Sequence, residues 1–381
     1  MRKRIGLCMI VKNEAHVIRR CLESALPLID YVCIVDTGSS DGTQDVIRSF
    51  LREHKIAGEV VDEPWQDFAY NRSFALKHLR ERKDIDYGLM IDADNILIYD
   101  QGFAAEKFKR ELTHDFYDIS LRTGSVIYRL PLLFSNKLEF RYKGVLHEFL
   151  DYTAAMSRGV ANGFINNQIQ DSARNQNPRK YQDDSAVFEK ALGTETDPFL
   201  VTRYTFYLAQ SYRDSDDPEK ALVAYQRRAE MGYWEQEVFY SLYQIAKVKL
   251  QLAYPDSEVI QAYLAAYEVC PSRAEALHGA VQFCRLQQKY QQGYLLAKHS
   301  LLIALPKDGL FVEQWIYDYG LLDEYSIVAY WAGHYRESFD ACLKLLRDAT
   351  VPVDQRERIR TNADFAIDKL NNPDLRKLLP I

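Results

Sequence analysis

The chain has 381 residues, of which 47% are hydrophobic and 27% are charged, a composition that is typical of a soluble globular protein. This length exceeds what one ordinary hydrophobic core needs, so we expect two domains. The formal net charge of -6 argues against a broad nucleic-acid-binding surface, and only a local basic groove stays open as an alternative.

The cysteines and the apolar runs indicate where the protein resides. The six cysteines show neither a C-x-x-C spacing nor histidines at zinc-site intervals. Cys8 and Cys33 lie within apolar runs, so we interpret the thiols as reduced core residues. No apolar run approaches the roughly 20 residues that a membrane helix requires. We therefore expect a cytoplasmic protein with no membrane span.

The first part of the chain alternates short apolar runs with helical patterns. This alternation predicts right-handed crossovers and a mostly parallel sheet. We expect strands at residues 5–11, 31–35, 59–62 and 87–91, and helices at residues 14–24, 43–53 and 67–81. Ligands gather at the carboxyl ends of the strands in such sheets. Three polar clusters follow strands here, at residues 12–14, 36–41 and 92–94.

Asp92 and Asp94 carry the sharpest chemical signal. They follow the apolar run at residues 87–91 and are separated by one residue. Two unpaired carboxylates at a strand end repel each other, and a divalent cation such as Mg²⁺ or Mn²⁺ removes that repulsion. Such an ion can neutralise the diphosphate of a departing nucleotide. The alternative is a polar turn capped by Asn95.

Asp36 is the second candidate for contact with a nucleotide. It closes the expected strand at residues 31–35 and begins a turn rich in Gly and Ser. A carboxylate in this place can accept hydrogen bonds from a base or a ribose. Asp41 and Thr43 are better explained as caps of the following helix.

From about residue 197 the pattern becomes helical throughout. Small residues recur from Ala209 to Ala246, 37 positions apart, and from Ala246 to Ala280, 34 positions apart. This period is typical of tetratricopeptide-like repeats, and an irregular helical bundle is the alternative. We therefore divide the chain into an α/β domain, residues 1–180, and an all-α repeat domain, residues 181–381. Residues 162–180, rich in Asn and Gln, are interpreted as a connecting segment over the active site.

Five segments stand in the order found in one enzyme family: residues 7–14, 34–43, 65–72, 91–94 and 142–148. They resemble the family 2 glycosyltransferases of the GT-A fold, a Rossmann-like fold. The W-x-D-F-x-x-x-R and G-x-(V/L)-H-E segments resemble a subgroup with tetratricopeptide-like helices behind the catalytic domain. That subgroup includes the sublancin S-glycosyltransferase and lipopolysaccharide glucosyltransferases. The resemblance covers about residues 5–230.

The resemblance implies an inverting transfer of a hexose from a nucleotide sugar, expected to be UDP-linked, with Mn²⁺ or Mg²⁺ as cofactor. It implies a nucleotide-sugar site made by Val11, Asn13, Glu14, Asp36, Arg72 and Asp92. It implies a metal site made by Asp94, Asp92 and His147. In the same way, Glu148 is the expected general base, with His147 beside it in the catalytic group.

One departure from the subgroup affects the metal site. Relatives commonly carry a histidine after the next strand, where this chain has Gln168 and Gln170. Either one of these glutamines replaces it as a weaker ligand, or His147 is the only imidazole available. The alternative function is therefore a weakened nucleotide-sugar-binding module that recruits a partner through its helical repeats.

The remaining partners stay open at this point. Arg174, Arg179 and Lys180 either close over the diphosphate or form a solvated charged surface. The acceptor is a saccharide, a peptide or protein, or, less in keeping with the net charge, modified DNA. The helical domain is also the expected surface for a homodimer.

Overall fold

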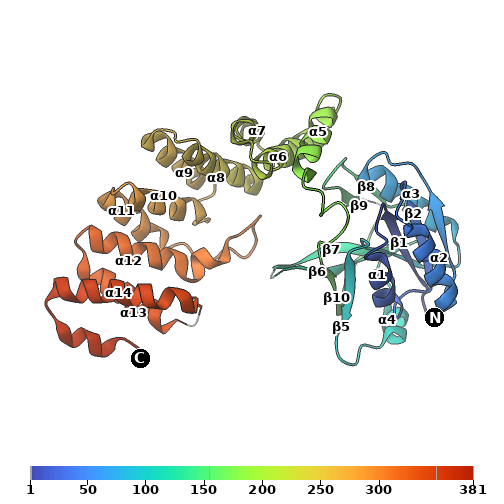
Figure 1. The fold of residues 1–381 in the computed structure, drawn as a ribbon, viewed down its shortest axis with the longest axis horizontal. Helices are drawn as coiled ribbons and strands as arrows, with labels where there is room; N and C mark the ends of the chain where they lie inside the picture. Colours follow the sequence, from blue (N-terminus) through green and yellow to red (C-terminus); the bar gives the residue numbers. More distant parts are fainter. Residues whose placement is uncertain (1, 125, 154, 349, 381) are drawn as a thin grey trace. The chain divides into compact units, whose positions relative to one another are not determined.

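The computed structural model describes residues 2–124, 126–153, 155–348 and 350–380, and the chain forms two compact units, Met1–Thr194 and Glu195–Ile381 (Figure 1). We expected the boundary after residue 180. It lies later because helix α5 (Lys180–Leu192) belongs to the first unit. Asp184 of this helix forms an ion pair with Arg174, which precedes it in the same unit.

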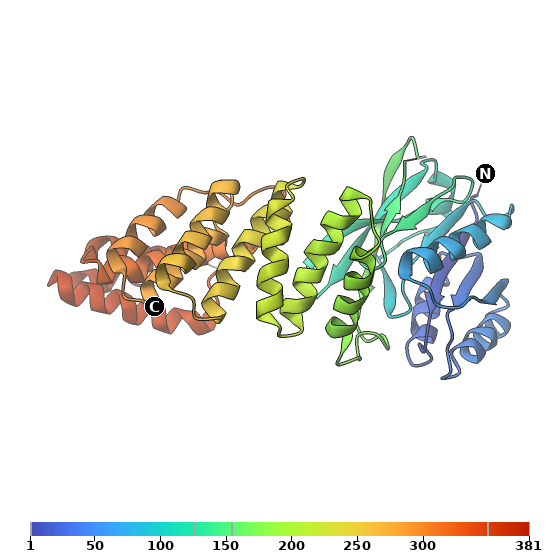
Figure 2. The same cartoon turned by 90° about the horizontal axis from the view of Figure 1, so that it is seen from above.

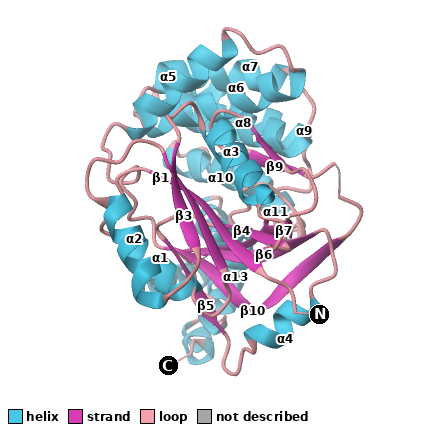
Figure 3. Cartoon of the chain, turned by 90° about the vertical axis from the view of Figure 1, so that its right-hand side faces the viewer, coloured by secondary structure: helices cyan, strands magenta, loops and turns pink. Residues whose placement is uncertain are grey.

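The first unit is built on a twisted eight-stranded sheet with the order β3-β2-β1-β4-β7-β6-β10-β5 (Figure 3). Its strands are β1 (Ile5–Val11), β2 (Tyr31–Asp36), β3 (Gly58–Asp62), β4 (Tyr87–Met90), β5 (Asn95–Tyr99), β6 (Phe116–Thr123), β7 (Val126–Ser135) and β10 (Arg158–Gln168). The first four in the sheet order run parallel, which confirms the α/β prediction. Strand β7 is antiparallel to β4 and to β6, and β5 is antiparallel to β10, so the other half is mixed.

The connecting segment predicted at residues 162–180 is wrong for its first part. Residues 162–168 belong to β10, which pairs with both β5 and β6. Only the part after Gln168 is a loop that leads to α5. A separate two-stranded sheet joins β8 (Arg141–Lys143) and β9 (Phe149–Asp151).

The helices cover both faces of the parallel half of the sheet. Ile5, Leu7 and Met9 of β1 share one core with α1 (Ile18–Ala25) and α2 (Thr43–His54), whereas Cys8 joins a second core with α3 (Phe68–Glu81). A strand that is buried on both faces reads as a continuous apolar run, as β1 does. All six cysteines are buried free thiols, as predicted for core residues. A short helix, α4 (Ala105–Glu111), follows β5.

The second unit is a series of helices in which sequence neighbours pack side by side (Figure 2). They are α6 (Pro198–Asp214), α7 (Pro218–Glu230), α8 (Glu235–Gln251), α9 (Asp256–Val269), α10 (Glu275–Leu286), α11 (Tyr290–Ser300), α12 (Leu321–Trp331), α13 (Tyr335–Arg347) and α14 (Val353–Leu370), with short π and 3-10 turns at Ile316–Gly320 and Pro373–Leu378. Ala209, Ala246 and Ala280 are completely buried, so the predicted small residues do lie where helices meet. In the described part of the chain no helix is long and apolar enough to cross a bilayer.

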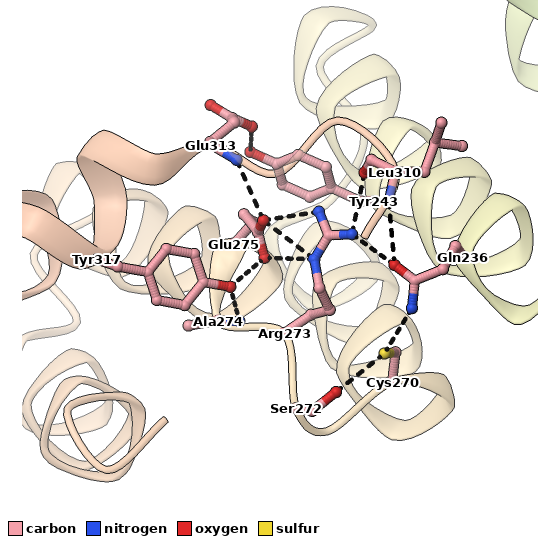
Figure 4. A network of polar contacts seen from close by, with 10 residues as sticks. All are labelled: Gln236, Tyr243, Cys270, Ser272, Arg273, Ala274, Glu275, Leu310, Glu313 and Tyr317. Carbon is pink, nitrogen blue, oxygen red and sulfur yellow. Dashed lines mark hydrogen bonds and ion pairs between the residues drawn. The ribbon is translucent and has the colours of Figure 1, made fainter. Parts of the chain in front are cut away.

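A long connection between α11 and α12, residues 301–313, interrupts this regular series. It is held by a buried ion pair in which Arg273 Nη2 lies 2.7 Å from Glu275 Oε1 (Figure 4). Arg273 Nη1 also donates to the backbone carbonyl of Leu310 at 3.0 Å and to Gln236 Oε1 at 2.8 Å. The hydroxyl of Tyr317 donates to Glu275 Oε2 at 2.7 Å. The pair therefore fixes the connection to α8 and α10.

Replacing Arg273 by Met should strongly destabilise the helical unit. The change leaves the Glu275 carboxylate buried without its counter-charge, which costs about 3–5 kcal/mol of unfolding free energy. Urea unfolding followed by tryptophan fluorescence measures this, because three of the four tryptophans, Trp234, Trp315 and Trp331, lie in this unit.

The matched control is the double change R273M/E275Q, which removes both charges and keeps an acceptor for Tyr317. It should recover part of the lost stability. A double variant as unstable as R273M alone would show that the buried charge is not the cause.

Candidate active site

The loops after β1 and β2 are tied together by local hydrogen bonds. Asn13 has a positive φ of 59°, and its Oδ1 accepts from the backbone N–H of Ser40 at 2.8 Å. The backbone N–H of Glu14 donates to Thr43 Oγ1 at 2.8 Å, at the start of α2. Because an Asn side chain tolerates the left-handed region, this turn forms at low cost and directs Glu14 inward.

A cavity of about 720 Å³ lies at the carboxyl ends of β1 and β4. This is the edge of a parallel sheet at which ligands bind. The cavity brings together eight of the predicted site residues: Val11, Asn13, Glu14, Arg72, Asp92, Asp94, His147 and Glu148. The ninth, Asp36, does not line it, although the adjacent Thr37 does.

Asp36 is a buried carboxylate, and only one of its two oxygens accepts hydrogen bonds from the described residues. Its side chain ends β2 and is 1% exposed. Oδ1 accepts from the backbone N–H groups of Gly38 at 2.8 Å and Ser39 at 2.7 Å. Oδ2 is buried and has no hydrogen-bond partner among the described residues. A buried acceptor of this kind can take a donor from a ligand.

Arg72 links two of the predicted carboxylates. Its Nη2 lies 2.6 Å from Asp92 Oδ1, and its Nε lies 2.6 Å from Glu148 Oε1. Burial disfavours the charge on Arg72, but Asp92 and Glu148 outweigh this effect and raise its pKa. The guanidinium also lies 5.7 Å from the ring centre of Tyr142. Arg72 is thus a fixed cation inside the cavity.

Asp94 and Glu14 form a second, uncompensated acidic pair. Asp94 is 2% exposed, and its pKa is raised by burial and by the charge of Asp92. Burial raises the pKa of Glu14 to about 7, and the charge of Asp94 adds to this effect. Burial is the main cause of both shifts, and the neighbouring carboxylates make a smaller contribution. A cation bound beside these carboxylates would favour their ionised forms.

The third predicted metal ligand is not assembled with the other two. No group of three or more His, Cys, Asp or Glu side chains in the described ranges could hold a metal ion. His147 has a positive φ of 50°, and its ring stacks on Phe188 of α5 with centroids 6.2 Å apart. Of the two glutamines, Gln168 lines the cavity, and its Oε1 accepts from Thr123 Oγ1 at 2.9 Å.

The loop after Gln168 contacts the acidic pair through residues that the sequence analysis missed. Ser172 donates its backbone N–H, and Asn175 its side-chain amide, to Asp94 Oδ2 at 3.3 Å each. The backbone N–H of Ala173 lies 3.4 Å from Glu14 Oε2. Two of these contacts use the backbone, which carries no residue-type signal, so only the position of this loop could be predicted.

The basic residues of this loop differ in their placement. Arg174 and Lys180 line the cavity, whereas Arg179 does not. The guanidinium of Arg174 lies 4.9 Å from the ring centre of Phe68, another lining residue that was not predicted. Trp65 also lines the cavity and is 41% exposed.

Comparison with known proteins identifies a family for one segment of the chain. Residues 7–120 match the model of glycosyl transferase family 2. This segment is a family 2 glycosyltransferase domain. The domain contains Asp36, Arg72, Asp92 and Asp94, and the cavity extends beyond it to Glu148 and the loop before α5.

Two relatives are each similar to part of the chain. An uncharacterized glycosyltransferase of Rickettsia felis is 25% identical over 246 residues, which are 62% of this chain and 79% of that protein. A TPR repeat-containing protein of Synechococcus elongatus is 28% identical over 152 residues, or 39% of this chain. The match spans 35% of the length of that protein.

Two solved structures are similar to this chain, with TM-scores below 0.4. S. aureus TarS 1–349, in complex with UDP-GlcNAc, has a TM-score of 0.39 and 13% identity, with 76% of this chain and 92% of that chain covered. A tetratricopeptide repeat protein of Parabacteroides merdae has a TM-score of 0.37 and 14% identity, with 52% of this chain and 70% of that chain covered.

Replacing Glu14 by Gln should change the pH dependence of stability of the glycosyltransferase domain. Because the folded state raises the pKa of Glu14 from 4.5 to about 7, its contribution to stability is present below pH 4.5 and is lost as the pH rises through 7. At pH 8 the neutral variant should therefore melt about 2–4 °C higher than the wild type. This shift corresponds to about 1 kcal/mol of unfolding free energy. At pH 4 the two should melt together.

Thermal unfolding followed by circular dichroism gives both melting temperatures. Glu235→Gln, at an exposed glutamate of α8, is the matched control and should leave the pH profile unchanged. Equal melting temperatures of wild type and E14Q at pH 8 would contradict the raised pKa.

Proposed function

We propose that this protein is a metal-dependent, inverting glycosyltransferase that moves a hexose from a nucleotide sugar, expected to be UDP-linked, to an acceptor. The observation that carries the proposal is the bridge from Arg72 to Asp92 and Glu148 inside one cavity. It links Asp92 of the D-x-D motif to the proposed base. The cavity volume of about 720 Å³ lies within the usual range for small-molecule sites, about 300–1,000 Å³.

The nucleotide is proposed to bind beside the ends of β1 and β2. Val11 and Asn13 line this part of the cavity. The unused Oδ2 of Asp36 is the proposed acceptor for an N–H group of the base or an O–H group of the ribose. The N3–H of uracil can donate to a carboxylate oxygen, whereas N3 of cytosine is itself an acceptor.

Asp92 and Asp94 would hold the Mg²⁺ or Mn²⁺ ion. Within the described residues, the protein supplies fewer than three His, Cys, Asp or Glu ligands to such an ion. Two carboxylates therefore suit an ion that takes its remaining ligands from phosphate oxygens. The raised pKa of Asp94, caused by burial and by Asp92, fits a missing positive charge. When bound, the ion would neutralise the diphosphate leaving group. His147 is proposed to contact the same diphosphate.

Glu148 is the proposed general base. Its Oε1 is held by Arg72, while Oε2 accepts no hydrogen bond within the described residues. Glu148 would take the proton of the acceptor hydroxyl while that oxygen forms a bond to the anomeric carbon. The bond from this carbon to the diphosphate oxygen breaks, and its electron pair leaves with the nucleotide. A single attack from the opposite face inverts the anomeric configuration.

Metal-dependent nucleotide binding should require Asp94. Thermal-shift titration with UDP, GDP, CMP and dTDP, each with Mn²⁺, Mg²⁺ or EDTA, should show stabilisation by one nucleotide only when metal is present. Asp94→Ala should lose it because the change removes a proposed ligand. Asp45→Ala, where the side chain is 90% exposed, should behave as wild type. A shift that persists in EDTA would contradict the metal dependence.

Replacing Glu148 by Gln should separate chemistry from binding. The amide oxygen can still accept from Arg72 Nε, so the donor should bind with a Kd within about threefold of wild type. The rate of nucleotide release from the donor sugar should fall about 10²- to 10⁴-fold, because the base is lost. Glu139→Gln, at an exposed glutamate, is the matched control. Parallel loss of donor binding and release would refute the assignment.

A further inference from the structure

The helical unit contains a cavity of about 470 Å³ that the proposed transfer chemistry does not use. One face of α8 forms its main wall through Tyr240, Gln244, Lys247 and Gln251, at positions that follow the helical period. The opposite wall comes from the long connection between α11 and α12, including Phe311. The volume is large enough for a small ligand.

The wall formed by the connection is held in a fixed position. Arg273 anchors the carbonyl of Leu310 at 3.0 Å, next to Phe311 (Figure 4). Phe311 has a positive φ of 51°, which costs a bulky residue about 1–3 kcal/mol. The residue is nevertheless 49% exposed, and its ring centre lies 4.9 Å from that of Tyr240. The fold therefore maintains a strained residue whose ring borders the cavity.

Gln244 is the second indication of a ligand. Its side chain is 4% exposed and lines the cavity. Its amide makes no hydrogen bond to any residue that the structure describes. Gln244 is not among the residues with a fully buried, unpartnered polar atom, so we infer that its amide faces the cavity. A ligand in the cavity that offers both a donor and an acceptor would satisfy it.

The charges around the cavity favour a neutral ligand. Arg213 is paired with Asp214, with Nε 2.7 Å from Oδ1. Lys247 lies over the Tyr243 ring, and the hydroxyl of Tyr243 donates to Glu313 Oε1 at 2.9 Å. With Asp214 counted, two positive and two negative groups surround the cavity, so the site does not select an anion.

The mixture of groups fits the chemistry of a sugar. Each sugar hydroxyl can donate and accept, as can the amides of Gln244 and Gln251, while Lys247 donates and Glu313 accepts. The rings of Tyr240 and Phe311 can pack on the apolar C–H face of a sugar ring.

We propose that this cavity binds a neutral saccharide. The saccharide site follows from the lining of the cavity and does not depend on the proposed function.

Saturation-transfer NMR on the full chain tests the site with maltotriose, cellotriose and chitotriose as neutral probes and 3′-sialyllactose as the charged probe. At least one neutral trisaccharide should bind with millimolar affinity. Phe311→Gly and Gln244→Ala should each weaken it about tenfold or more. Glycine accepts a positive φ, so the first change removes the ring without straining the backbone.

Phe365→Ala, at a phenylalanine of α14 that is 52% exposed, and Asp94→Ala are the controls and should bind the probe as wild type does. The proposal is overturned if no neutral trisaccharide binds, if binding survives both cavity changes, or if 3′-sialyllactose binds more tightly. Loss in D94A but not in F311G would place the saccharide in the transfer cavity and also overturn it.

The thermal shift with the nucleotide and metal separates the two proposals. It should be unchanged in F311G and Q244A, because neither residue lies in the glycosyltransferase domain. If wild type lacks the nucleotide shift but binds a trisaccharide through Phe311, the proposed transfer fails and the saccharide site stands. If the shift is present and the trisaccharide does not bind, only the saccharide site fails.

Discussion

The buried guanidinium of Arg72 is the interaction on which the candidate site depends. It pairs with carboxylates 20 and 76 residues away in sequence, Asp92 and Glu148, and without it both would face one cavity uncompensated. A buried charge is tolerated only when it is paired, so the position of α3 against the sheet fixes the D-x-D residues and the proposed base together. One cation on a rigid helix therefore organises groups from three separate motifs.

The same charge divides the cavity into two sides with different chemistry. Asp92 and Glu148 share the guanidinium of Arg72, whereas Asp94 and Glu14 accept hydrogen bonds from backbone N–H groups and one amide. Burial raises the pKa values of Asp94 and Glu14, with a further contribution from neighbouring carboxylates. In the proposed function this is the side on which a cation would bind.

The helical unit uses a buried ion pair for a similar purpose. Replacing a buried pair by apolar groups is often neutral or stabilising, so net stability is a weak explanation for the pair of Arg273 and Glu275. Its geometry instead fixes the connection that carries Phe311. In both units a buried arginine holds segments that are distant in sequence at the wall of a cavity.

The sequence by itself determined the parallel strands, the carboxylates after β4 and the helical repeats, because apolar periodicity and turn residues are local properties. Tertiary structure alone decided the antiparallel pairing of β10 with β5, the inclusion of α5 in the first unit and the contacts of Asn175 with Asp94. It also separated His147 from a three-ligand metal cluster within the described residues. These features depend on contacts between distant segments, and no local pattern of residue types encodes which distant partner a side chain will meet.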